Sequence, residues 1–254
     1  DEYPCNEGGS QTSQAQNHYV RKMGGTFKRS KTCQLPETVK IEGHVSISGT
    51  SPSDELVAFI GPGKLSHLYN GRHFSISGEF TLTLRWLKLQ DGLYYGGGSV
   101  WVEKGGTLVT TNCWFFNNAV QYSGAAISAQ NDATVQLVDT NVSHSTYGGD
   151  GAIYIYKQPS GTGILRLQVQ GGFFFENKGT SATSKGAAVY CYYATECLLN
   201  GTHIERNVVG GSGGGVAFIG TTRYSGNTFS ILNSVVRGNL AGDSGGGIYT
   251  QAEI

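Results

Sequence analysis

The stretch that decides the fold is Asn112-Cys113-Trp114-Phe115-Phe116-Asn117-Asn118, because the chain spells nearly the same two-asparagine phrase five times. The five copies begin, at a spacing of 29 to 33 residues, at Asn112, Asn141, Gly171, Asn200 and Asn233. Asparagine and glycine are the residues that most readily adopt a positive φ. The repeat therefore predicts a ladder of left-handed turns, one in each repeat.

A glycine phrase alternates with the asparagine phrase. Its six copies are Gly97-Gly98-Ser99-Val100, Gly124-Ala125-Ala126-Ile127, Gly151-Ala152-Ile153, Gly186-Ala187-Ala188-Val189, Gly213-Gly214-Gly215-Val216 and Gly245-Gly246-Gly247-Ile248. Each copy leads into residues that alternate in polarity, which is typical of a half-buried strand. With the stretch between the phrases, each repeat holds about three short strands. Units this small bury a core only by stacking, so the sequence predicts an all-β, right-handed parallel β-helix.

Composition supports this prediction and narrows the function. The 254 residues include 39 glycines but only five prolines and one methionine, as suits a protein dense in turns and sheet. The formal net charge is zero and no cluster of Lys or Arg stands out, which argues against binding to nucleic acid. No apolar run approaches the roughly 20 residues of a membrane-spanning helix, so we expect no contact between this segment and a membrane.

The repeats divide the chain into two parts. Residues 1–38 are polar and free of repeats, so we expect an N-terminal arm or cap, with Cys5 and Cys33 as candidates for a disulfide. Residues 39–254 are the predicted β-helix, with irregular coils over 39–90 and regular repeats over 91–254. The chain begins without methionine and stops as a new coil starts. We therefore expect a signal peptide that has been removed, a C-terminal continuation, and an extracellular or cell-surface location.

The two phrases together resemble the repeats of the chlamydial polymorphic membrane proteins, which alternate G-G-A-[ILV] with F-x-x-N. The likeness covers residues 74 to 249, and Phe115-Phe116-Asn117-Asn118 and Phe174-Phe175-Glu176-Asn177 match the second motif directly. The second coil departs from it, with His144 and Tyr147 where Phe and Asn are expected. The resemblance implies a parallel β-helix displayed at a cell surface that adheres to a partner without catalysis.

A polysaccharide lyase or hydrolase on the same fold is the main alternative. Such enzymes need carboxylates paired at a common register of adjacent coils. The acidic residues of the repeats show no such pair, so we predict no catalytic residues. The histidines show no spacing typical of metal ligands, so we predict neither a metal site nor a cofactor. An ice-binding face would need a regular threonine array, and Thr107, Thr110 and Thr111 are not repeated.

Cysteines and sequons offer further candidate sites. Cys191 and Cys197 flank a turn within one coil, where a local disulfide and two stacked thiols both stay possible, while Cys113 aligns with Val142 and is expected in the core. Asn141-Val142-Ser143 and Asn200-Gly201-Thr202 are acceptor motifs for N-glycosylation. Both asparagines also belong to the predicted turn ladder, in which an inward side chain could not carry a glycan.

One row of aromatic residues stands out as a candidate binding surface. If the aliphatic residue after each glycine phrase faces the core, the next residue faces solvent, and a second row follows one pleat along. The aromatic members of the two rows are Trp101, Tyr154, Tyr190 and Tyr249, and Tyr156 and Tyr192. Exposed aromatic rings on a sheet suit a glycan or another protein chain of a surface assembly, and mutual stacking between coils is the structural alternative.

Overall fold

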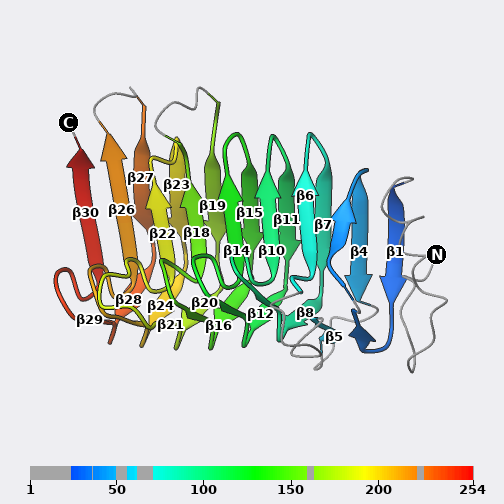
Figure 1. Cartoon of the computed structure of the whole chain (residues 1–254), viewed down its shortest axis with the longest axis horizontal. Coiled ribbons are helices and arrows are strands. Elements are labelled where there is room, and N and C mark those ends of the chain that lie inside the picture. Colours follow the sequence, from blue (N-terminus) through cyan, green and yellow to red (C-terminus); the bar gives the residue numbers. More distant parts are fainter. Residues whose placement is uncertain are drawn as a thin grey trace.

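A computed structural model describes residues 24–35, 37–49, 56–61, 71–158, 163–221 and 226–253. Within these ranges the chain is all-β, without a helix, and its strands stack side by side along one axis as a parallel β-helix (Figure 1). Nowhere in the described ranges is there a helix that could span a membrane. The predicted fold class is therefore confirmed.

In the described residues, three eight-stranded sheets run the length of the stack, and a six-stranded fourth sheet joins them from β9 onward. The β1–β27 sheet contains β1 (Gly25–Arg29), β4 (Val45–Gly49), β7 (Thr81–Arg85), β11 (Thr107–Thr111), β15 (Thr134–Val138), β19 (Arg166–Gln170), β23 (Glu196–Asn200) and β27 (Thr228–Leu232). The β3–β30 sheet contains β3 (Val39–Ile41), β6 (Phe74–Ser77), β10 (Val100–Glu103), β14 (Ile127–Gln130), β18 (Ile153–Tyr156), β22 (Val189–Tyr192), β26 (Val216–Thr221) and β30 (Ile248–Glu253).

The other two sheets close the coil. The β2–β28 sheet contains β2 (Cys33–Gln34), β5 (Val57–Ile60), β8 (Leu87–Gln90), β12 (Trp114–Phe116), β16 (Asn141–Ser143), β20 (Phe173–Phe175), β24 (His203–Glu205) and β28 (Val235–Arg237). The β9–β29 sheet contains β9 (Leu93–Tyr94), β13 (Ala119–Val120), β17 (Thr146–Tyr147), β21 (Lys178–Gly179), β25 (Val208–Val209) and β29 (Leu240–Ala241). Each regular coil thus holds four strands rather than the three expected. The fourth strand is only two residues long, too short to show an alternating pattern in the sequence.

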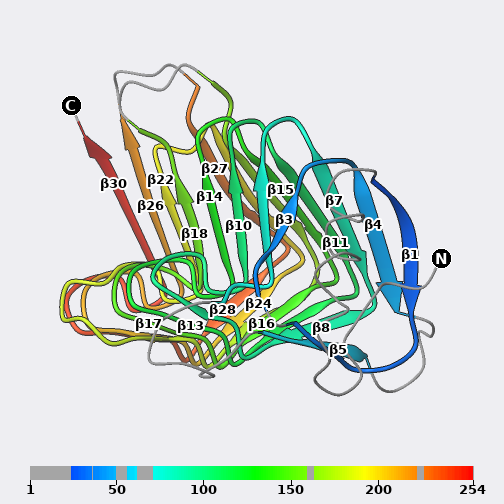
Figure 2. The same ribbon diagram turned by 45° about the vertical axis from the view of Figure 1, so that its right-hand side comes forward.

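Each coil visits the sheets in a fixed order, as from β10 through β11 and β12 to β13 (Figure 2). Strands of successive coils pair in parallel, and one side of each strand faces the core. Aliphatic and aromatic residues stack inside at a constant register. The row on the β2–β28 sheet, for example, consists of Phe115, Val142, Phe174, Ile204 and Val236. Val142 therefore takes the place that the sequence alignment gave to His144.

The predicted turn ladder exists, but with partly different members. Asn112, Gly171 and Asn233 adopt the expected positive φ at the corner between the β1–β27 and β2–β28 sheets. In the other two coils the corner residues are Asp139 and Gly201. Asn141 and Asn200 are therefore not ladder residues: Asn141 is the first residue of β16, and Asn200 is the last residue of β23. Aligning the phrases by their asparagines placed the corner residue two positions too late at Asn141 and one position too early at Asn200.

A different asparagine column points inward. It lies at the corner after the β2–β28 sheet and consists of Asn118, Asn177, Asn207 and Asn239, with Ser145 in the second coil where Tyr147 had been expected. The Asn177 amide Nδ2 donates to Asn207 Oδ1 at 2.9 Å and to the Val142 carbonyl at 3.0 Å. Each side chain thereby satisfies buried backbone groups that the tight corner leaves without a sheet partner.

The described cysteines are all buried. Cys191 in β22 and Cys197 in β23 form a disulfide within one coil, so the first of the two alternatives is confirmed. Cys113 is a buried free thiol, as expected, although it lies one residue before β12 and not at the register of Val142. Burial raises the pKa of the Cys113 thiol to about 12, so the thiol stays protonated at neutral pH. Cys33 is buried in β2, and its expected partner Cys5 lies outside the described residues.

The boundary expected at residue 38 moves toward the N-terminus. Residues 25–29 and 33–34 already form β1 and β2, which pair in parallel with β4 and β5 of the following coil. The stacked sheets therefore include the later part of the proposed arm. Its first 23 residues lie outside the described ranges, as does residue 254.

Candidate functional site

The outward face of the β3–β30 sheet carries the predicted aromatic row. Val100, Ile127, Ile153, Val189, Val216 and Ile248 share one inward register. The residue after each forms the outward row Trp101, Ser128, Tyr154, Tyr190, Ala217 and Tyr249, and Tyr156 and Tyr192 pair in the next outward row. The predicted register of these residues is therefore confirmed.

The predicted exposure of that row is wrong at two positions. Ser128 is 1% exposed and Tyr190 is 5% exposed, while Trp101, Tyr154, Tyr156, Tyr192 and Tyr249 are half-buried. The cause is the glycine turn before each strand, which folds over the outward face. A Cβ added at Gly186 would lie 2.9 Å from the Tyr190 Cβ, and one at Gly97 would lie 2.9 Å from the Trp101 ring. These glycines are needed for their positive φ and for this close approach.

The tyrosines of β18 and β22 stack on one another. The Tyr154 and Tyr190 rings lie 5.7 Å apart, and the Tyr156 and Tyr192 rings lie 5.5 Å apart. Tyr193 adds a further contact, 4.0 Å from the Tyr192 ring. The mutual stacking that the sequence left as an alternative is thus present, and it stabilises neighbouring coils.

An open groove of about 380 Å³ lies beside this cluster, toward the N-terminal end of the same face. Its lining residues are Arg72, Tyr94, Gly96, Trp101, Tyr122, Ser123, Ser128, Gln130 and Tyr154. Four of these are aromatic, and Tyr122 is 60% exposed. The groove therefore combines wide apolar ring surface with a few hydrogen-bonding groups, as sites for small ligands do.

Arg72 is the cation of the groove. Its guanidinium carbon lies 4.1 Å from the centre of the Tyr94 ring and 4.9 Å from that of the Trp101 ring. Burial lowers the pKa of Arg72, and the nearby Tyr94 and Glu103 oppose that shift. A guanidinium still carries its charge under such conditions. Arg72 therefore packs on two aromatic rings, and its N–H groups can donate hydrogen bonds to a ligand.

Tyr154 supplies a neutral hydroxyl. Burial, helped by the nearby Asp150 carboxylate, raises the pKa of Tyr154, so its phenol stays protonated. Asp150 itself accepts a hydrogen bond from the Lys185 backbone amide at 2.7 Å, and burial raises its pKa. Among the described residues, no carboxylate lines the groove. The described lining can therefore hold a polar molecule with apolar faces.

The sequence missed Arg72, Tyr94 and Tyr122. Tyr94 and Tyr122 come from the turns and short strands before the glycine phrase, not from the strands that carry the aromatic row. For Tyr122 a sequence signal was present, because Tyr95 and Tyr122 both stand two residues before the first glycine of their phrases. The structure stacks these two positions, and the Tyr122 amide donates to the Tyr95 carbonyl at 2.7 Å. Arg72 belongs to the irregular coils, where no repeat gave its register.

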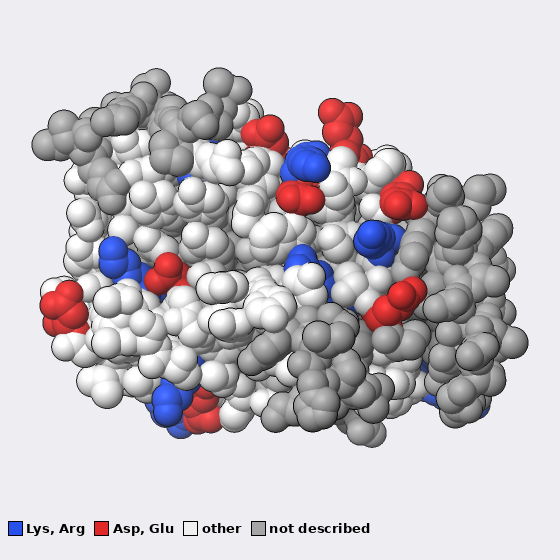
Figure 3. All heavy atoms as spheres, in the orientation of Figure 1, with Lys and Arg blue, Asp and Glu red and all other residues white. Residues whose placement is uncertain are grey.

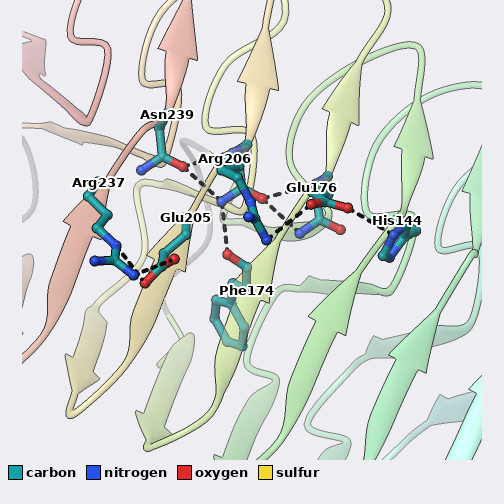
Figure 4. Close-up of polar contacts among 9 residues, drawn as sticks. His144, Phe174, Glu176, Glu205, Arg206, Arg237 and Asn239 are labelled. Atoms are coloured by element: carbon teal, nitrogen blue, oxygen red, sulfur yellow. Dashed lines mark hydrogen bonds and ion pairs between the residues drawn. The ribbon is translucent and has the colours of Figure 1, made fainter.

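Two acidic residues at the β2–β28 face pair with Arg and His side chains. Glu176 lies 3.0 Å from His144 and 3.1 Å from Arg206, and Arg237 holds Glu205 at 3.0 Å (Figure 4). The Arg237 side chain lowers the pKa of Glu205. Figure 4 shows these contacts crossing from coil to coil, where each carboxylate meets a cation rather than a second carboxylate. This arrangement suits a solvated ionic ladder.

Charge is sparse and mixed elsewhere. On the face seen in Figure 3, acidic and basic side chains stand singly or in small mixed groups, with uncharged surface between them. Among the described residues, no group of three or more His, Cys, Asp or Glu is placed to hold a metal ion. Comparison with known proteins adds no identification, since no family model, curated protein or solved structure matches the chain.

Proposed function

We propose that this chain is a non-catalytic β-helix of an extracellular or cell-surface protein, acting in adhesion by binding a glycan in the aromatic groove of the β3–β30 sheet. The observation that carries the proposal is the groove itself, which Trp101, Tyr122 and Tyr154 line together with Arg72, whose guanidinium lies over the Trp101 ring. Sugar rings have apolar C–H faces that pack on aromatic rings, and their hydroxyls accept hydrogen bonds from Arg and Tyr. No cofactor or metal is needed for such binding.

Three further observations support this proposal. The Cys191–Cys197 disulfide is typical of a protein made in an oxidising compartment, which favours an extracellular location. The mixed charge of the surface favours a neutral ligand over nucleic acid or an anionic membrane. The likeness to polymorphic membrane protein repeats points the same way, toward display at a surface.

The experiment is a binding screen of the purified chain against immobilised glycans, followed by calorimetry with the best ligand. Replacing Trp101 with Ala should weaken binding by more than about tenfold, as loss of an aromatic anchor does. Phe173→Ala is the matched control, because Phe173 is an exposed aromatic residue on the β2–β28 sheet and lies away from the groove. Equal loss in both variants, or no glycan bound at all, would contradict the proposal.

Two alternatives are outcomes of the same work. If the Trp101 face captures other chains of the protein's own assembly instead of a glycan, the protein is a structural subunit. If a bound polysaccharide is shortened during the assay, the protein is a lyase or hydrolase.

A further inference from the structure

Two asparagines that the sequence placed inside the coil lie outside it. Asn141 opens β16 and Asn200 closes β23, and both side chains are partly exposed. The positions are the two Asn-x-Ser/Thr sequons of the chain. Both flank the corner between the β1–β27 and β2–β28 sheets, one just after Asp139 and Thr140 and one just before Gly201. An outward asparagine can carry a glycan without disturbing the core.

The amide nitrogens at both positions are unengaged among the described residues. Asn141 uses Oδ1 to accept a hydrogen bond from the Phe173 backbone amide at 2.9 Å. Asn200 uses Oδ1 to accept one from Asn233 Nδ2 at 3.1 Å. Neither Nδ2 donates a hydrogen bond to a described residue, in contrast to Asn177 and Asn207, whose Nδ2 atoms are committed inside the ladder. The atom to which an N-glycan is joined is thus free at both sequons.

Each of these asparagines adjoins a large exposed apolar side chain of the next coil. Phe173, which adjoins Asn141, is 50% exposed, and Leu232, which pairs with Asn200, is 49% exposed. The Phe173 ring packs on His203 of the following coil at 4.7 Å, so its covered side faces away from Asn141. On the opposite side, Asn141 pairs with Trp114. The Trp114 ring leans away along its strand, toward Ser143 and Phe116, so a first sugar attached to Asn141 has the Phe173 ring as its aromatic neighbour.

We propose that Asn141 and Asn200 are N-glycosylation sites and that the first sugar at Asn141 packs on Phe173. In the transfer step a lipid-linked pyrophosphate donor supplies the glycan. The bond between sugar C1 and the phosphate oxygen breaks, the C1–Nδ2 bond forms, Nδ2 loses one proton, and the lipid pyrophosphate leaves. The two glycans would stand two coils apart, roughly 10 Å along the axis. They lie at a different face from the Trp101 groove, so this inference rests on the extracellular location in the proposed function but not on binding in the groove.

Occupancy is tested by expressing the chain with a secretion signal in cultured animal cells and mapping its peptides by mass spectrometry. An N-glycan-releasing enzyme converts each occupied asparagine to aspartate, so we expect that conversion at both sequons. Asn141→Gln and Asn200→Gln should each remove one glycan from the intact mass. A sequon in an appended flexible tag reports on the competence of the cells. Occupancy of the tag with bare Asn141 and Asn200 would overturn the proposal.

The packing on Phe173 has its own readout. Releasing the glycans from the native protein should lower the melting temperature by about 2–4 °C. The same treatment of Phe173→Ala should cause a clearly smaller loss, because the sugar has no ring to cover. Phe175→Ala is the matched control, since Phe175 lies on the same strand at the register of Ser143 and should keep the full effect. An equal loss in wild type and Phe173→Ala would refute the contact.

Discussion

The inward asparagine column and the outward face of the β3–β30 sheet differ in how strictly their residues repeat from coil to coil. At the corner, Asn177, Asn207 and Asn239 repeat because each side chain bonds the next coil. On the face, the row that starts at Trp101 holds Ser128 and then Tyr154, whose side chains differ in size and chemistry. Interior positions are thus fixed by their neighbours above and below, whereas outward positions are free to vary from coil to coil and to carry function.

The prediction with the largest expected effect compares alanine substitutions at two asparagines of one coil. Asn207→Ala leaves the Phe174 carbonyl and the Asn177 amide without their buried partners, so we expect a loss of about 4 kcal/mol in the free energy of unfolding. In unglycosylated protein, Asn200→Ala removes only an exposed contact with Asn233 and should cost under about 0.5 kcal/mol. Denaturant unfolding followed by circular dichroism measures both. Similar losses in the two variants would mean that the inward ladder is not the stabilising element.

A buried histidine provides a second test of the interior. His73 Nε2 lies 2.8 Å from the Phe59 carbonyl, its Nδ1 lies 3.0 Å from Ser99 Oγ, and burial lowers its pKa from 6.5 to about 4. Between these two values the unfolded chain binds a proton that the folded chain does not. This contribution is complete above pH 6.5, falls as the pH drops toward 4, and amounts to about 3 kcal/mol.

The measurement is the free energy of unfolding at several values between pH 7 and pH 4. His73→Gln keeps an amide donor but does not titrate, so its stability should fall less over this range than that of the wild type. All carboxylates are shared by the two proteins, which isolates the histidine. Parallel curves would show that His73 is protonated in the folded chain at higher pH than its burial implies.

The disulfide should have a moderate effect. Cys191 and Cys197 close a short loop, with a sequence separation of 6, between the β3–β30 and β1–β27 sheets. The chain-entropy account gives about 2 kcal/mol for a loop of this size. Cys33 is disulfide-bonded as well, so a thiol reductant acts on both the wild type and a Cys191→Ala/Cys197→Ala variant. We therefore expect the variant to be less stable than the wild type by this amount without reductant and equally stable with it. A stability difference between the two proteins that persisted under full reduction would mean that the substitutions act through packing and not through the disulfide.

Much of the fold follows from the sequence because its cause is periodic. The glycine phrase and the inward aliphatic rows repeat with the coil, so the β-helix and the register of Trp101 and Tyr154 could be predicted. The corner residues could not, because Asp139 and Gly201 take positive φ as readily as Asn112, and matching asparagine letters chose Asn141 and Asn200 instead. The groove was only half predicted, because Arg72 and Tyr122 reach it from turns that carry no strand pattern.

The smallest expected effect on stability is that of a substitution at Tyr122. Comparing it with a substitution at Tyr190, on the same face, tests the contrast most directly. Tyr122 is 60% exposed in the groove, so Tyr122→Ser should change the free energy of unfolding by under about 0.5 kcal/mol and still weaken glycan binding. Tyr190 is 5% exposed beneath the Gly186 turn and stacks on Tyr154, so Tyr190→Ser should cost more stability than binding. Thermal unfolding and calorimetry on both variants separate the two roles. If Tyr190→Ser abolished binding with its melting temperature unchanged, the packed tyrosine cluster would be part of the binding site, and the boundary between supporting and binding aromatics would have to move toward the C-terminal coils.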